Sequence, residues 1–263
     1  MIDEWDLAAT NQRRIRERHY EVAVIPIGSL EAHNQHLPEG TDWLLVDHVA
    51  RESCRRAWEK CQGVLCVPGL PYSSDCNLMG FPMTIDVSQA TVNAVITDVV
   101  RSLRHHGIRK FFILNGHGGN HFIPLVRVLQ HDMDVQVFLC NWWTLIDDRY
   151  GELFEKPDDH AGEMETSSVM AVYPELVELD RAGDGEPAPF RFEALRRGWI
   201  QTARDFARMN PNCAVGDPRA ASAEKGQACL ELACTRLAGF LVELATTPID
   251  ATFPFAPGSE MPG

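Results

Sequence analysis

The sequence predicts an α/β fold in which a parallel sheet is covered by helices on both faces. Short, apolar and β-branched segments have the composition of buried strands, near residues 22–27, 64–68, 110–114 and 135–141. Longer segments between them favour helices, near residues 43–60, 88–106 and 120–132. Strands that alternate with helices along the chain are typical of a parallel sheet, because each crossover returns the chain to the same end of the sheet.

Residue types at the ends of these segments indicate where the helices begin and end. Thr41 or Asp42 could cap the first helix, and Ser88 and Gly107 are typical start and stop residues for the second. The last segment, about 219–246, predicts a long helix with an apolar stripe. The stripe consists of Leu230, Ala233, Leu237, Phe240 and Leu241. Such a stripe is more typical of a helix that faces the core than of an oligomer interface.

Length and composition predict one domain over residues 1–263. A chain of 263 residues with 45% hydrophobic content can bury one core, and no linker divides it. The net charge of −13 argues against nucleic acid or an anionic membrane as partners, because both require clustered Lys and Arg. Residues 1–20 are charged and no apolar run approaches ~18 residues, so we expect neither a secretory signal nor a membrane span. The eight cysteines lack a Cys-x-x-Cys pair, which indicates reduced thiols and a cytoplasmic protein.

Four potential metal ligands lie within twelve residues, directly after the first predicted strand: Glu31, His33, His36 and Asp42. Residues two apart in an extended segment face the same side, so Glu31 and His33 can converge on one point. A polar surface loop would explain each residue alone, but four of them at the carboxyl end of a strand favour a site. Carboxylate and imidazole ligands without thiolate suit Zn, Mn or Fe(II) and argue against a structural zinc site.

A second motif, Asn115-Gly-His117-Gly-Gly-Asn120, lies between the third predicted strand and a helix. A glycine-rich turn at a helix N-terminus could bind a phosphate group. However, the P-loop lysine and the Rossmann glycine spacing are both missing. We therefore favour the alternative that His117 is a metal ligand and that the glycines let the backbone pass close to the metal.

A third motif, His160-Ala-Gly-Glu163-Met-Glu165-Thr-Ser167, stands at the start of a segment with helical spacing over 163–172. Glutamates in a first helical turn are stabilised by the helix dipole, so helix capping explains part of this pattern. His160 precedes Glu165 by five residues and follows a polar loop, which makes it a further candidate for the site.

Together with the segment Gly216-Asp-Pro-x-x-Ala-Ser-Ala-Glu-Lys-Gly226, these motifs resemble the creatininase (creatinine amidohydrolase) family, in the same order from about residue 22 to 226. The resemblance implies a Rossmann-like, three-layer α/β/α fold. It also implies hydrolysis of an amide or related carbonyl compound at a dinuclear metal centre, and assembly as a homo-oligomer, a hexamer. By position, Glu31, His33 and His117 would be metal ligands, and Asp42 would bridge the two metals. His160 matches the family's catalytic histidine.

Two positions depart from the family pattern. Creatininase itself has a glutamate ligand two residues after the histidine of the second motif, where this chain has Gly119. We expect Glu165 to supply the missing carboxylate, with Glu163 as the alternative, and we do not expect creatinine to be the substrate. Met83 stands where the family more often has a glycine, in Phe-Pro-Gly-Thr. Its side chain either alters the floor of the pocket or packs in the ordinary way.

The expected activity is hydrolysis assisted by two divalent ions, Zn in the first place, with Mn or Fe(II) as alternatives. The ions would share Asp42 and a bridging hydroxide, and His160 would carry a proton to the leaving group. The expected substrate is a small molecule: a cyclic amide, a formamide or a cyclic keto compound. The alternatives are a peptidase-like amidohydrolase that acts on a modified peptide, or a catalytically silent metal-binding protein.

Four further residues are expected around the metal ligands. His36 would orient a ligand or the substrate rather than bind the metal itself, and Glu163 would do the same unless it replaces Glu165 as the ligand. Trp142 and Trp143 end the fourth predicted strand, on the side where a pocket should open. One of them could form a wall against a ring-shaped substrate, and an aromatic pair in the core is the alternative.

Overall fold

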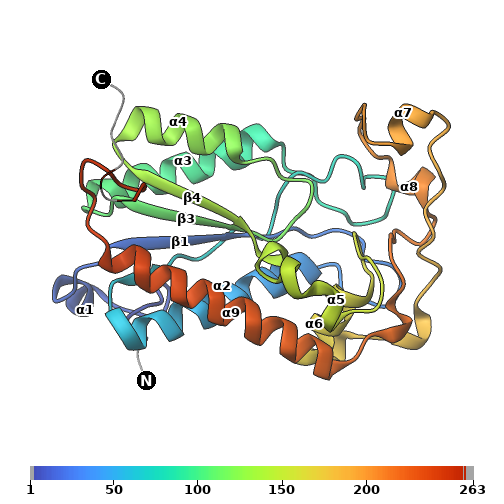
Figure 1. Cartoon of the computed structure of the whole chain (residues 1–263), viewed down its shortest axis with the longest axis horizontal. Helices are drawn as coiled ribbons and strands as arrows, with labels where there is room; N and C mark the ends of the chain where they lie inside the picture. Colours follow the sequence, from blue (N-terminus) through green and yellow to red (C-terminus); the bar gives the residue numbers. More distant parts are fainter. Residues whose placement is uncertain (1–2, 257, 259–263) are drawn as a thin grey trace.

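Four parallel strands form the central sheet of the computed structural model, which describes residues 3–256 and 258 (Figure 1). The strands are β1 (Val22–Ile27), β2 (Val64–Cys66), β3 (Lys110–Asn115) and β4 (Gln136–Asn141), in the order β2-β1-β3-β4. β1 and β3 pair over their full length, from Val22 beside Lys110 to Ile27 beside Asn115. The predicted parallel sheet is confirmed. β2 is shorter than expected because Pro68 follows it closely and has no N–H to continue the ladder.

Helices cover both faces of this sheet, so the structure has three layers (Figure 1). α2 (Thr41–Cys61), α6 (Glu163–Val172) and α9 (Ala223–Thr246) pack on one face, and α3 (Gln89–His105) and α4 (Ile123–Met133) on the other. Successive strand residues alternate between the two faces: Val22 and Val24 join the core beneath α2 and α9, whereas Ala23 and Ile25 join the core beneath α3 and α4. Both faces are thus apolar, as a doubly covered parallel sheet requires.

The long helices begin and end largely where local signals placed them. The Ser88 hydroxyl accepts a hydrogen bond from the Thr91 N–H and so caps α3, and Gly107 follows this helix with a positive φ of 97°. The start of α2 differs from the expectation, because Thr41 and Asp42 are its first residues and neither caps it; Gly40 is the N-cap. The Thr41 hydroxyl donates to the Pro38 carbonyl instead, and the Asp42 carboxylate turns toward His33 and His117.

The apolar stripe of α9 faces the core, as predicted. Leu230, Ala233, Leu237 and Leu241 are buried, and the partly exposed Phe240 packs against Phe112 and Phe138. No helix within residues 3–256 is long and apolar enough to cross a membrane.

The remaining elements are short and connect these layers. They are α1 (Gln12–Arg16), η1 (Trp142–Arg149), α5 (Tyr150–Leu153), η2 (Pro174–Leu176), η3 (Leu179–Arg181), α7 (Glu193–Arg196), α8 (Phe206–Met209) and η4 (Pro218–Ala220). α7 and α8 lie in a long connection between α6 and α9, at the right of Figure 1.

The carboxyl ends of β1 and β3 form the switch point of this topology. From β1 the chain passes through α2 and outward to β2, whereas from β3 it passes through α4 and outward to β4. The two connections leave on opposite faces of the sheet, so a crevice opens between the loops that follow β1 and β3. Open α/β sheets bind their ligands at such points.

Candidate metal centre

Carboxylates and imidazoles from four parts of the chain meet at this switch point. Glu31 and His33 come from the loop after β1, and Asp42 from the first turn of α2. His117 comes from the loop after β3, and Glu165 from the first turn of α6. Their ligand atoms form two groups, each within 4.8 Å: Glu31, Asp42 and His117 in one, and His33, Asp42 and Glu165 in the other.

Asp42 belongs to both groups, with one oxygen in each. Its Oδ1 lies 3.2 Å from Nε2 of His33, and its Oδ2 lies 2.9 Å from Nδ1 of His117. Glu31 Oε1 is 3.1 Å from the same His117 nitrogen, and Glu165 Oε2 is 3.9 Å from Nε2 of His33. A carboxylate that presents its two oxygens to two separate ligand sets has the placement required to bridge two ions.

Three imidazoles of the centre each direct one ring nitrogen at a backbone carbonyl. His33 Nδ1 lies 3.0 Å from the Glu31 carbonyl, His160 Nε2 lies 2.8 Å from the Ala32 carbonyl, and His117 Nε2 lies 3.0 Å from the Ser74 carbonyl. A carbonyl oxygen only accepts, so these nitrogens carry the hydrogen and donate it. The other nitrogen of each ring faces the carboxylates of the centre. Metal-binding histidines are held in this way. At His33 and His117, whose pKa values these carboxylates raise, that nitrogen would bind a metal after losing its proton.

Two buried polar atoms without hydrogen-bond partners are a second observation that favours divalent cations at this centre. Glu31 Oε2 and His33 Nε2 are buried within the centre and, in the described part of the chain, have no hydrogen-bond partner. A buried polar atom without a partner is costly, and coordination to a metal would satisfy both atoms. Oxygen and nitrogen ligands without sulfur suit Zn or Mn.

Burial and neighbouring charges shift the pKa values of the side chains in this centre. It raises the pKa of Glu31 to about 8 and that of Glu165 to about 8. Burial opposes a charge on His33, but the Asp42 carboxylate beside it raises the pKa of His33 to about 10. The pKa of Asp42 lies well below its usual range because His33 and His117 outweigh its burial. Without an ion, the Asp42 carboxylate is balanced by the imidazoles of His33 and His117, and Glu31 and Glu165 keep their protons near neutral pH. Divalent cations would take the place of these protons, because metal ligands bind in their deprotonated form.

His160 lies beside the ligand groups and is fully enclosed. Its ring is 4.2 Å from that of His33, and its Nδ1 is 3.7 Å from Glu31 Oε1. Burial, reinforced by the neighbouring His33, lowers the pKa of His160 to about 3, so the imidazole is neutral. A neutral imidazole with a lone pair directed at the centre can accept a proton; the same geometry also allows it to ligate together with Glu31 and His33.

Glu163 and Glu165 point in different directions. Glu163 Oε1 lies 2.5 Å from Nζ of Lys225 on α9, and its Oε2 accepts hydrogen bonds from the N–H groups of Glu155 and Lys156. Neither oxygen faces the centre, so Glu163 is not among the groups that could hold an ion in the described structure. It ties α6 to α9, and among the described residues no hydrogen bond or ion pair joins it to a ligand side chain, which differs from its expected place at the site.

The fold gives His36, Trp142 and Trp143 three different surroundings. His36 Nε2 lies 2.8 Å from the hydroxyl of Thr166, the residue after Glu165, and it makes no hydrogen bond to a ligand side chain among the described residues. Trp142 is 2% exposed and belongs to the core, whereas Trp143 lines the cavity over the centre. The expected aromatic wall is therefore available from Trp143 alone.

Both expectations for Met83 are wrong. Its side chain is 80% exposed and lines none of the cavities described below. Its φ of +65° is the left-handed conformation that favours glycine.

A residue that sequence analysis missed completes the environment of His117. Asp75 is fully buried in the connection after β2, with Oδ1 3.1 Å from Nε2 of His117. Its Oδ2 accepts a hydrogen bond of 2.5 Å from the Ser29 hydroxyl. The only sequence signal was its place after the second predicted strand, where a lone aspartate in a polar loop is ordinary.

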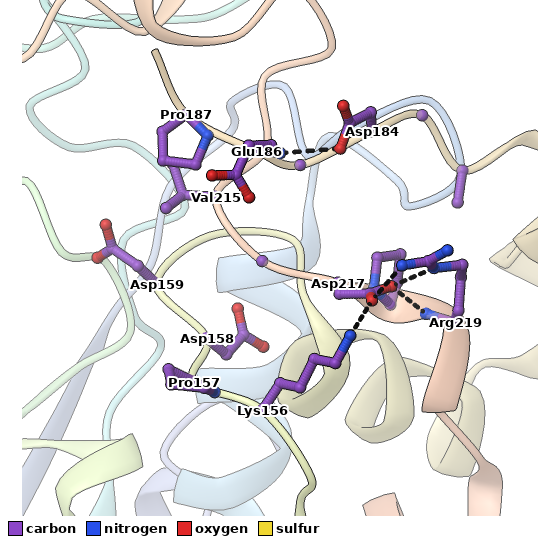
Figure 2. A pocket seen from close by; sticks show the side chains of 15 residues that line it. Lys156, Pro157, Asp158, Asp159, Asp184, Glu186, Pro187, Val215, Asp217 and Arg219 are labelled. Atoms are coloured by element: carbon purple, nitrogen blue, oxygen red, sulfur yellow. Dashed lines mark hydrogen bonds and ion pairs between the residues drawn. The ribbon is translucent and has the colours of Figure 1, made fainter. Parts of the chain in front are cut away.

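The cavity over the centre has a volume of about 560 Å³. Its lining includes five side chains of the centre and residues 201–204; the five are Glu31, Asp42, His117, His160 and Glu165. A second cavity, of about 800 Å³, adjoins it and shares Asp158 and Asp159 with it (Figure 2). There, Lys156 and Arg219 both bind the Asp217 carboxylate. A third cavity, of about 430 Å³, shares Trp143, Asp158 and Met164 with the first.

Comparisons with known proteins agree on one family. The family model described as creatinine amidohydrolase matches residues 7–241. The chain is 31% identical to creatinine amidohydrolase of Pseudomonas putida, over 84% of this chain and 89% of that protein. It is 29% identical to 3-dehydro-scyllo-inosose hydrolase of Thermotoga maritima, over 68% and 59% of the two chains. It is 30% identical to mycofactocin precursor peptide peptidase of Mycobacterium ulcerans, over 78% of each.

Solved structures agree with this assignment. A protein of Bacteroides fragilis, provisionally named creatinine amidohydrolase, superposes with a TM-score of 0.86 at 35% identity, over 95% of this chain and 100% of that one. A manganese form of creatininase has a TM-score of 0.75, and a mutant creatininase of Zn-Zn type has a TM-score of 0.76, both at 27% identity over 93% of this chain and 100% of theirs. These matches confirm the three-layer fold and the expected resemblance. The chain belongs to the creatininase family, whose named relatives are hydrolases.

Proposed function

We propose that this protein is a hydrolase that uses two divalent metal ions to cleave an amide or a related carbonyl bond. The observation that carries the proposal is the placement of Asp42, whose two oxygens lie in two different groups of potential ligands. Glu31 and His117 would complete the shell of one ion, and His33 and Glu165 that of the other. When bound, the ions would lower the pKa of a water molecule and polarise the substrate carbonyl. Zn and Mn are the favoured ions, because solved creatininases carry them.

The side chains of this centre have separate tasks in the proposed reaction. Asp42 and Glu31 would bind the ions through their carboxylates, and the backbone carbonyls of Glu31 and Ala32 fix the rings of His33 and His160. His160 keeps its Nδ1 free of a proton and directs it at the centre, so it can take a proton during attack and return it to the leaving group. Trp143 offers an aromatic surface to the bound substrate.

A small cyclic amide, a formamide or a cyclic keto compound is the favoured substrate class. Two relatives named for small-molecule substrates, creatinine amidohydrolase and 3-dehydro-scyllo-inosose hydrolase, support this choice. A modified peptide is the second candidate, and it is favoured by two observations. One relative is a precursor peptide peptidase, and the cavity over the centre shares lining residues with two neighbouring cavities that a small ring would leave empty.

The proposal is tested by counting metal ions in two aspartate variants of the same helix. We expect Asp42→Ala to lose bound metal and all hydrolysis, as His33→Ala should, because water cannot replace a bridging carboxylate. Asp47→Ala is the matched control, since Asp47 is also on α2 and belongs to neither ligand group in the described structure. Metal content is measured by mass spectrometry after dialysis, and activity on a panel of cyclic amides, lactams, cyclic ketones and short peptides. Two ions per chain in Asp42→Ala would contradict the dinuclear centre.

A further inference from the structure

Arg204 is the one arginine or lysine among the described residues that line the cavity over the centre. Apart from the two histidines, the other ionisable side chains that a substrate anion would meet in this lining are acidic: Glu31, Asp42, Asp158, Asp159 and Glu165. Three of these face the metal centre. Asp158 is engaged elsewhere, because its carboxylate accepts hydrogen bonds from the N–H groups of Gly162, Met164 and Glu165 at the start of α6.

The position of Arg204 is fixed by aromatic contacts that lead to the centre. The guanidinium carbon lies 4.9 Å from the centroid of the Phe206 ring. Phe206 is 3% exposed, and its ring packs edge-on at 5.1 Å against that of His160. The Phe206 ring therefore contacts both the Arg204 guanidinium and the imidazole of His160, which is a side chain of the reacting centre. A cation held against an aromatic face loses less freedom on binding than a free surface arginine.

Part of the guanidinium is available to a ligand. Its Nη1 pairs with Asp159 Oδ2, while Nε and Nη2 have no hydrogen-bond partner in residues 3–256. Both side chains of this pair are partly exposed, 37% for Arg204 and 48% for Asp159. Ion pairs with this much solvent contact are weak, so a second carboxylate can share the guanidinium or displace Asp159. A planar guanidinium with two free donor groups matches the two oxygens of a carboxylate.

We propose that Arg204 determines specificity by binding an anionic group of the substrate while the reacting carbonyl lies at the metal centre. The inference rests on the proposed function and narrows its substrate class. The favoured substrates are amides that carry a carboxylate a few bonds away from the carbonyl that is cleaved. Neutral rings of similar size lack the group that Arg204 would bind.

The test compares matched pairs of cyclic amides that differ by one carboxylate, dihydroorotate with dihydrouracil and 5-oxoproline with 2-pyrrolidinone. Binding to the full chain loaded with Zn is measured by isothermal titration calorimetry, and hydrolysis is followed in parallel. We expect the carboxylated member of at least one pair to bind more tightly. Arg204→Met should weaken that binding about 10- to 100-fold and leave the neutral member unchanged, because a hydrogen-bonded charge is lost. Arg204→Lys should retain part of the effect, since it keeps the charge but not the planar fork.

Asp159→Asn is the matched control, because it removes the partner of Arg204 and leaves the guanidinium in place. This variant should bind the carboxylated probe at least as tightly as the unmodified protein. The inference is overturned if no carboxylated probe binds more tightly than its neutral partner, or if Arg204→Met weakens both members equally. Binding that depends on Arg204 without hydrolysis of any panel compound would support the anion site and count against the proposed function. Hydrolysis that does not depend on the carboxylate of the probe would support the proposed function and count against the anion site.

Discussion

Replacing each of two neighbouring glutamates by glutamine should separate metal binding from stability. Glu165 Oε2 lies 3.9 Å from His33 Nε2 and belongs to a ligand group, whereas both oxygens of Glu163 are used by Lys225 and by backbone N–H groups. Glu165→Gln keeps the size of the side chain and an oxygen for the Ala161 N–H, but it removes the charge. Glu163→Gln makes the same chemical change two residues away.

The two substitutions should change different quantities: metal affinity in Glu165→Gln and the free energy of unfolding in Glu163→Gln. Glu165→Gln should lower metal affinity by at least ~10- to 100-fold, which corresponds to about 1.4–2.8 kcal/mol. The metal-free protein should lose little stability, because burial already disfavours the charge of Glu165 and raises its pKa to about 8. Glu163→Gln should bind metal normally. It should lower the free energy of unfolding by about 1–3 kcal/mol, because the charge opposite Lys225 is lost and one amide oxygen cannot accept from both Lys225 and the N–H groups of Glu155 and Lys156.

Two measurements distinguish these outcomes. Metal affinity is determined by competition with a chromophoric chelator, and thermal unfolding is recorded with and without EDTA. In Glu165→Gln the stabilisation by added metal should shrink, because the shift follows the ratio of free metal to Kd. In Glu163→Gln the Tm should fall with and without EDTA, by ~2–4 °C for each kcal/mol. Normal metal affinity in Glu165→Gln together with metal loss in Glu163→Gln would refute the assignment.

Four further outcomes are expected. His160→Ala should retain both ions and lose ~10²- to 10⁴-fold in kcat; loss of metal would assign this residue to ligation. Asp75→Asn should weaken metal binding ~10- to 100-fold through His117, measured by the same chelator competition, and unchanged affinity would contradict a role in orienting that ring. Asp158→Ala should lower the free energy of unfolding by about 0.5–2 kcal/mol in urea, because α6 loses its cap, and an unchanged midpoint would refute this. Light scattering should show a homo-oligomer, a hexamer by family resemblance, and a monomer at micromolar concentration would count against it.

Features encoded by neighbouring residues could be predicted from the sequence. Ser88 and Gly107 bracket α3 because capping and left-handed termination depend on a few adjacent backbone groups. The strands β1 and β3 follow from apolar runs that a covered parallel sheet requires on both faces. Glu31, His33 and Asp42 could be grouped because they lie within twelve residues at the end of a strand.

Features that depend on distant segments could not be predicted. Asp42 begins α2 without capping it, because its carboxylate is drawn to His33 and to His117, which is 75 positions away. Asp75 carried no signal of its own, since its partner His117 belongs to another loop. Trp142 and Trp143 are adjacent in sequence, yet one is in the core and the other lines the cavity, because the chain turns into η1 at this point.

The sequence by itself determined that carboxylates and imidazoles follow the strands of a parallel α/β sheet, because residue type and periodicity are local properties. Only the tertiary structure decided which of them meet. Glu163 and Glu165 stand two residues apart, so an α-helix of 3.6 residues per turn directs them to different sides. The packing of α6 against α9 sets the rotation of that helix, so that Glu163 pairs with Lys225 and Glu165 faces the candidate metal centre. Burial of both carboxylates then makes each depend on a specific partner, which lies in a distant part of the chain.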